Sequence, residues 1–145
     1  MNKLFLTAIL SGFVFVEFGC ADDTKSDFNG ICDLEFVKEE IKITNENKQV
    51  ISNEMNIFEG AKCQNGVMIF DYTYTPKYSA ELENFNDEQK KVAKRTMQHM
   101  LNSMYCEMPE FASHRENSVV MHYNYSTTNV KNFYEVEVSN KDCKK

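Results

Sequence analysis

The chain is 145 residues long, 42% of its residues are hydrophobic, and its formal net charge is −6 at pH 7. This length predicts a single domain that can bury one core. The acidic balance argues against a nucleic-acid partner, because binding to phosphate backbones requires clustered Lys and Arg. It also argues against simple electrostatic attraction to an anionic membrane surface.

The first 21 residues have the layout of a secretory signal peptide. Lys3 precedes a nearly continuous apolar run over 4–16, and small residues follow at positions 19–21. Cleavage after Ala21 would release a soluble protein. Cleavage after Gly19 would instead leave Cys20 as the first residue, which makes it a candidate lipidation site of the kind found in bacterial lipoproteins.

The residues before Cys20 leave both fates open. Gly19 fits the pattern that precedes a lipidated cysteine, whereas Glu17 and Phe18 depart from it. Either fate predicts export, to the periplasm or outer membrane of a bacterium or to the medium. No later apolar run approaches the roughly 18 residues that a membrane span needs, so membrane contact is expected only through an N-terminal lipid.

Residues 22–30 are polar and predict a flexible leader before a single domain over 31–145. In the first part of this domain, Ile41 and Ile43 alternate with polar residues, which predicts a half-buried strand. A second strand is predicted from Val50-Ile51 and 55–58. The pair Asn65-Gly66 then indicates a hairpin turn.

Three further strands are predicted from alternating β-branched and aromatic residues, over 67–75, 118–126 and 133–138. The first of them places Tyr72 and Tyr74 on one face, and the second does the same with Tyr123 and Tyr125. If these two strands pair, the four tyrosines would form an aromatic ladder.

A helix is predicted over 86–106, between the first and second of these strands. Asn86 and Gln89 have the spacing of a capping box, and Pro109 lies just beyond the predicted end. Apolar residues recur at three- and four-residue spacing and form one stripe: Ala93, Met97, Met100, Leu101 and Met104. Strands, a long helix and a closing hairpin together predict an α+β fold, a small antiparallel sheet with the helix packed on one face.

Four cysteines follow the signal, and they are separated by gaps of about thirty residues or more. Zinc sites usually contain closely spaced pairs, so these cysteines predict two disulfides in an exported chain. Three pairings are possible. We favour Cys32–Cys63 and Cys106–Cys143, because the second pair would join the end of the helix to the segment after the last strand.

Motifs for catalysis and cofactor binding are weak. His99 is predicted on the helix, His114 in a loop and His122 in a strand, and no nucleophile-elbow or glycine-rich phosphate motif accompanies them. We therefore predict no cofactor, no metal and no catalytic residue. A small hydrolase, with His114 or His122 beside a carboxylate in a pocket, is the less favoured alternative.

Tyr72, Tyr74, Tyr123 and Tyr125, with the methionines of the helix, are candidates for a groove that binds an apolar peptide. The alternative, which we favour, is that they form the core between sheet and helix. Tyrosines near strand ends can do both, with their hydroxyls at the rim.

The layout resembles small bacterial envelope lipoproteins, and among these it is loosely similar to the pilotins of type II secretion. The resemblance covers roughly 86–143, where Cys106 ends a helix, two strands follow, and Cys143 lies in the tail. It implies a sheet with flanking helices, closed by a late disulfide, that binds a helical tail of the secretin. It transfers no binding residue to this chain.

The leading hypothesis is thus an exported, non-enzymatic binding or accessory protein of the envelope, with another envelope or exported protein as its partner. A second hypothesis is an immunity protein, since an acidic surface would suit a basic exported toxin.

Overall fold

A computed structural model of the protein describes residues 30–143. The predicted signal peptide, Cys20 and nearly all of the predicted leader lie outside the described residues. Four strands form one sheet in the order β1-β2-β3-β4, where β1 is Asn56–Gln64, β2 is Val67–Tyr74, β3 is Val120–Ser126 and β4 is Tyr134–Val138. The predicted α+β class is confirmed.

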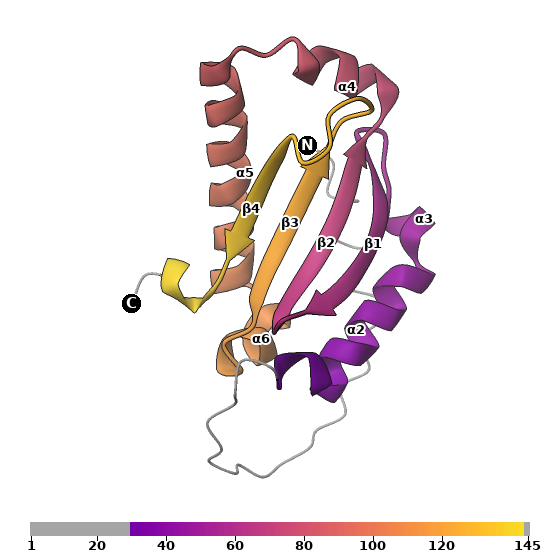
Figure 1. Cartoon of the computed structure of the whole chain (residues 1–145). Coiled ribbons are helices and arrows are strands. Elements are labelled where there is room, and N and C mark those ends of the chain that lie inside the picture. Colours follow the sequence, from indigo (N-terminus) through magenta and orange to yellow (C-terminus); the bar gives the residue numbers. More distant parts are fainter. Residues whose placement is uncertain (1–29, 144–145) are drawn as a thin grey trace.

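The sheet is mixed rather than antiparallel, which corrects the predicted topology. β1–β2 and β3–β4 are antiparallel pairs, whereas β2 and β3 run parallel. Parallel neighbours require a crossover connection, and here the chain between β2 and β3 forms α4 (Pro76–Glu83), α5 (Asp87–Glu107) and α6 (Ala112–Glu116). Figure 1 shows α5 alongside β4, and α2 and α3 on the β1 side.

The β1–β2 hairpin turns where the sequence predicts it. Gln64 pairs with Val67, and the two turn residues Asn65 and Gly66 have φ angles of 53° and 76°. Positive φ at both central positions defines the type I′ turn that Asn-Gly favours.

The long helix also begins as predicted. The Asn86 side chain accepts from the Gln89 backbone N–H, and the Gln89 side chain accepts from the Asn86 backbone N–H, both over 2.9 Å. α4 was not predicted, because Pro76 was interpreted only as the end of a strand. In the structure it stands in the first turn of α4, where a missing N–H costs nothing.

The predicted strand around Ile41 and Ile43 is wrong, because both residues lie in the helix α2, Glu35–Glu46. Val37 and Ile41 are four residues apart and both pack in the core. Alternation over so few residues does not distinguish the two-residue period of a strand from the 3.6-residue period of a helix. A short helix, α3 (Lys48–Ile51), follows, so the second predicted strand is wrong at Val50 and Ile51. Its later part, around 55–58, is correct and extends further as β1.

The core lies on one face of the sheet. Most of the alternating residues that share this face are buried, and Ala61, Cys63 and Tyr72 are partly buried against them. The helix α5 adds Leu101 and Tyr105 to the same cluster. We call this side of the sheet the tyrosine face, defined by Phe58 of β1, Met68, Phe70, Tyr72 and Tyr74 of β2, Met121, Tyr123 and Tyr125 of β3, and Tyr134, Val136 and Val138 of β4.

Candidate functional site

The predicted aromatic ladder forms across β2 and β3. Phe70 pairs with Tyr123 and Tyr72 with Tyr125, and in both pairs the rings are stacked, with centroids 5.1 and 5.3 Å apart. Tyr74 lies next to Tyr125, with ring centroids 5.9 Å apart. Since parallel pairing sets these residues directly opposite one another, the ladder depends on the crossover through α4 and α5.

Burial keeps these phenols neutral. Desolvation raises the pKa of Tyr72 to about 12, and it raises the pKa values of Tyr123, Tyr125 and Tyr134 as well. The hydroxyl groups of Tyr74 and Tyr134 share a hydrogen bond across the tyrosine face. A buried hydroxyl group needs such a partner. The hydrogen bond between Tyr74 and Tyr134 lies where the tyrosine face meets the space beside α4 and α5.

An apolar hollow of about 290 Å³ opens at this point, between α4, α5 and the sheet. Tyr74 and Tyr134 border it on the sheet side, and α5 contributes Met97 and Met100. The complete lining is Met55, Tyr74, Tyr78, Glu81, Leu82, Phe85, Ala93, Thr96, Met97, Met100 and Tyr134. We call this space the apolar hollow.

Two methionines of the apolar hollow are accessible from outside. Met55 is 48% exposed and Met100 is 47% exposed, although both side chains are apolar. Methionine has a flexible, polarisable side chain that adapts to different apolar surfaces. The hollow can therefore receive an apolar side chain of another molecule.

Of the tyrosines and methionines that the sequence suggested for a peptide-binding groove, only some border the apolar hollow. Tyr74, Met97 and Met100 line the apolar hollow, whereas Tyr123 and Tyr125 are buried in the core. Sequence reasoning missed the contributions of the segment before β1, of α4 and of β4: Met55, Tyr78, Leu82, Phe85 and Tyr134. The periodic apolar positions of α4 were the available signal, but the helix itself had not been predicted.

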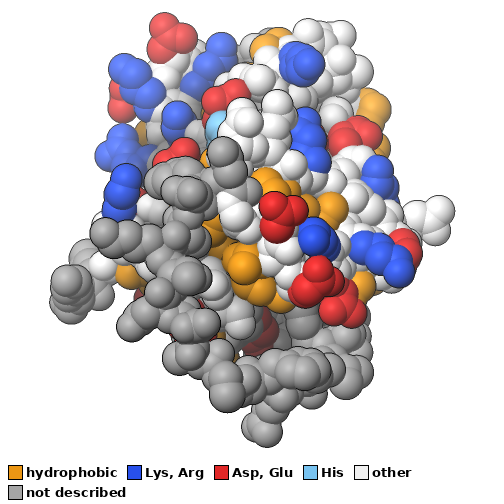
Figure 2. All heavy atoms as spheres, turned by 60° about the horizontal axis from the view of Figure 1, so that its bottom comes forward, with side chains coloured by type: hydrophobic (Ala, Val, Ile, Leu, Met, Phe, Trp, Pro, Cys, Tyr) orange, Lys and Arg blue, Asp and Glu red, His pale blue; other side chains and the backbone are white. Residues whose placement is uncertain are grey.

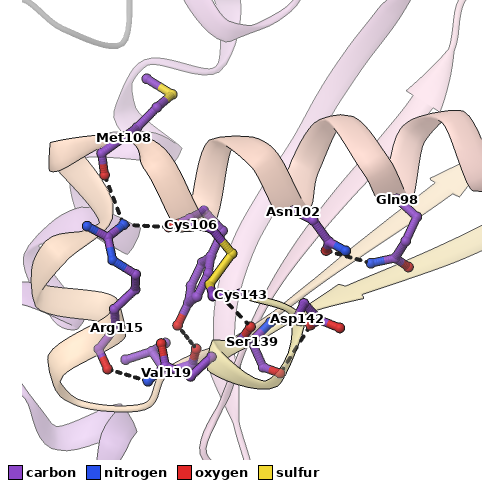
Figure 3. Close-up of a disulfide and its surroundings, with 11 residues drawn as sticks. Gln98, Asn102, Cys106, Met108, Arg115, Val119, Ser139, Asp142 and Cys143 are labelled. Carbon is purple, nitrogen blue, oxygen red and sulfur yellow. Dashed lines mark hydrogen bonds between the residues drawn. A yellow bond between two sulfur atoms is a disulfide. The ribbon is translucent and has the colours of Figure 1, made fainter. Parts of the chain in front are cut away.

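Both favoured disulfides are confirmed, Cys32–Cys63 with a Cα–Cα distance of 5.4 Å and Cys106–Cys143 with 5.3 Å. Figure 3 shows the second bridge at the end of α5. There Arg115 donates to the carbonyl groups of Tyr105 and Met108, which satisfies acceptors that the helix end leaves free. The disulfide and Arg115 together fix the lower end of α5 beside β4.

His114 does not lie in a loop, which corrects the prediction. It belongs to α6 and is only 4% exposed, and its Nε2 lies 2.7 Å from Oε2 of Glu40 in α2. Phe36 and Phe111 pack against its ring. The burial of His114 could not be predicted from the sequence, because its partner Glu40 lies 74 positions earlier in the chain.

The other two histidines are not buried. His99 is exposed on α5. His122 lies on the opposite side of the sheet from the tyrosine face, with its Nε2 3.6 Å from Oε2 of Glu135. No histidine lines the apolar hollow or the polar hollow described below, so neither hollow supports the hydrolase alternative.

Within residues 30–143, no group of three or more His, Cys, Asp or Glu side chains is placed to hold a metal ion. In the same part of the chain, no helix is both long enough and apolar enough to cross a membrane. On the face shown in Figure 2, acidic and basic side chains are interspersed around a hydrophobic patch.

The comparisons with known proteins identify a fold but no family. No protein-family model matches the chain, and no curated protein matches it. Among solved structures, the chain is similar to the crystal structure of "a putative secreted protein" from Pseudomonas aeruginosa, with a TM-score of 0.63 and 9% sequence identity. The match covers 85% of this chain and 100% of the other, so the two proteins share a fold over most of their length.

Proposed function

We propose that this protein is an exported, non-enzymatic accessory protein of a bacterial envelope, which binds an apolar segment of another envelope protein. The apolar hollow is the observation that carries the proposal. It lies at an exposed edge of the core, and its lining is apolar except for Glu81, Thr96 and the hydroxyl groups of three tyrosines. Pockets of this composition bind apolar side chains and take their specificity from a few polar groups.

The partner segment that fits best is an amphipathic helix. Helix-in-groove recognition uses apolar side chains spaced along one helix face, and Met55 and Met100 offer them an accessible, adaptable surface. Glu81 would accept hydrogen bonds from polar groups beside those anchors. This proposal agrees with the pilotin-like layout, in which a domain of this kind binds a helical tail of a secretin.

Two observations support export. The chain carries two disulfides, and disulfides persist mainly in oxidising compartments such as the periplasm. The solved structure with the same fold is described as "a putative secreted protein". Anchoring through Cys20 is part of the same proposal, and the intact mass of the mature chain tests it by revealing the cleavage site and any acyl groups.

The test is site-specific photocrosslinking in living bacteria. A photoreactive amino acid replaces Met100 at the apolar hollow or, as the control, exposed Val130 in the loop after β3. We expect one envelope protein to be crosslinked from position 100 and not from position 130. The further substitution Tyr78→Ala should reduce this crosslink severalfold.

Equal crosslinking from both positions would overturn the proposal, and so would a crosslink that Tyr78→Ala leaves unchanged. Mass spectrometry of the crosslinked segment identifies the partner. If the crosslinked partner is an exported toxin and not an envelope protein, the protein is an immunity protein and the accessory function is rejected.

A further inference from the structure

A second hollow lies on the side of the sheet opposite the tyrosine face, and we call it the polar hollow. Its volume is about 620 Å³. Asp71 and Thr73 of β2 and Asn124 and Ser126 of β3 border it, and these residues alternate with the buried tyrosines of the same strands. The loop over 127–132 contributes the remaining polar side chains on one side.

This loop is held in place by α4. Oε1 of Glu83 accepts from Thr127 Oγ1 (2.5 Å) and from the Asn129 N–H (3.1 Å), while Oε2 accepts from Asn129 Nδ2 (2.9 Å). Oγ of Ser79 accepts from the Thr128 N–H over 3.0 Å. Since the loop is positioned before any ligand arrives, binding would not have to order it.

Between the two central strands, the polar hollow contains an incomplete hydrogen-bond network. Asp71 accepts from Lys62 Nζ over 3.3 Å and from Asn124 Nδ2 over 2.7 Å. Oδ1 of Asn124 is buried and has no partner within the described residues. Buried polar atoms are seldom left unpaired, so this oxygen is an unsatisfied acceptor beneath the surface of the hollow.

The chemistry of the lining favours a neutral ligand that both donates and accepts hydrogen bonds. Lys62 and Lys131 balance Glu59 and Asp71, so that neither an anion nor a cation finds a surplus of opposite charge. Hydroxyl and amide groups make up most of the rest, namely Thr73, Asn124, Ser126, Thr127, Thr128, Asn129 and Asn132. Each hydroxyl of a sugar can donate and accept, which matches this mixture.

We propose that the polar hollow binds a neutral saccharide, whose hydroxyl groups exchange hydrogen bonds with the hydroxyl and amide side chains of its lining. The site is separate from the apolar hollow, because the two lie on opposite faces of the sheet. The test of saccharide binding is therefore independent of the test of the proposed protein partner. It would place the domain against envelope glycans while the apolar hollow binds the protein partner.

The test is an NMR titration of the ¹⁵N-labelled domain, with both disulfides intact, against neutral chito-, malto- and cello-oligosaccharides. We expect saturable shifts of the Asn124 side-chain amide and of backbone amides in 127–132 with at least one of them. Asn124→Leu should weaken binding about two- to twelvefold, the loss that corresponds to one net hydrogen bond of about 0.5–1.5 kcal/mol.

Two further variants separate binding from folding. Thr73→Val keeps the side-chain shape and should weaken binding about twofold or more, whereas Thr96→Val at the apolar hollow should leave the titration unchanged. The proposal is overturned if no oligosaccharide gives saturable shifts at millimolar concentration. It is also overturned if the shifts lie outside the polar hollow, or if a folded Asn124→Leu protein binds as well as the parent.

Discussion

The two faces of the sheet are built from alternate residues of the same strands, and they differ in burial and polarity. On the tyrosine face, Met68 is fully buried, and one residue later Ile69 is only partly buried on the other face. The buried face holds the protein together and opens to the surface at the apolar hollow. The opposite face carries a network of polar side chains around Asp71 and Asn124. One domain can therefore present two surfaces of different chemistry.

The largest difference between the faces should appear on truncation of neighbouring core and surface residues. We expect Met68→Ala to lower the free energy of unfolding by about 2–5 kcal/mol, because it leaves a cavity beneath the sheet. Ile69→Ala, the matched control on the same strand, should cost clearly less. Denaturant titration of both variants measures this, and equal losses would show that the two faces contribute equally.

The next largest effect concerns the disulfide that fixes α5 beside β4. Replacing Cys106 and Cys143 together with alanine should cost about 2–4 kcal/mol, since the loop of the unfolded chain is no longer restricted. The apolar hollow should loosen more than the polar hollow, because α5 lines only the former. Hydrogen exchange compares the two, and uniform loosening would contradict the expected difference.

A smaller effect is expected from the two histidine–carboxylate pairs, one buried and one at the surface. Glu40→Gln should cost about 1–3 kcal/mol, because the side chains of His114 and Glu40 are only 5% and 14% exposed. Glu135→Gln should cost less than about 1 kcal/mol, since His122 and Glu135 are 29% and 43% exposed. Thermal unfolding at pH 6 to 7 measures both, and a reversed order would refute the assigned burial.

The smallest effect should be local to the loop over 127–132. Hydrogen bonds from Asn129 and Thr127 lower the pKa of Glu83, so its contribution is complete above the ordinary glutamate range and is lost as pH falls through the lowered value. Glu83→Gln at neutral pH, or acidification of the parent below about pH 4, should increase loop motion in ¹⁵N relaxation. Glu81→Gln, on the same helix, is the control and should leave the loop unchanged.

Much of the molecule from residue 65 onwards follows from local sequence signals. The capping box at Asn86 and the Asn65-Gly66 turn are each specified within a few residues, and both appear as predicted. The alternation in β2, β3 and β4 likewise placed the tyrosines on one face. Four cysteines far apart in the chain, after a predicted export signal, were sufficient to favour the two bridges that form.

The sequence by itself thus determined the α+β class, the long helix and the tyrosine face, because short-range periodicity and capping encode them. The number and wide spacing of the cysteines favoured the two disulfides. Tertiary structure decided three other features. It placed Ile41 and Ile43 in a helix against β1, made β2 and β3 parallel, and buried His114 beside Glu40. Each of these depends on contacts between distant segments, and the two hollows depend on them as well, since every wall of each comes from a different part of the chain.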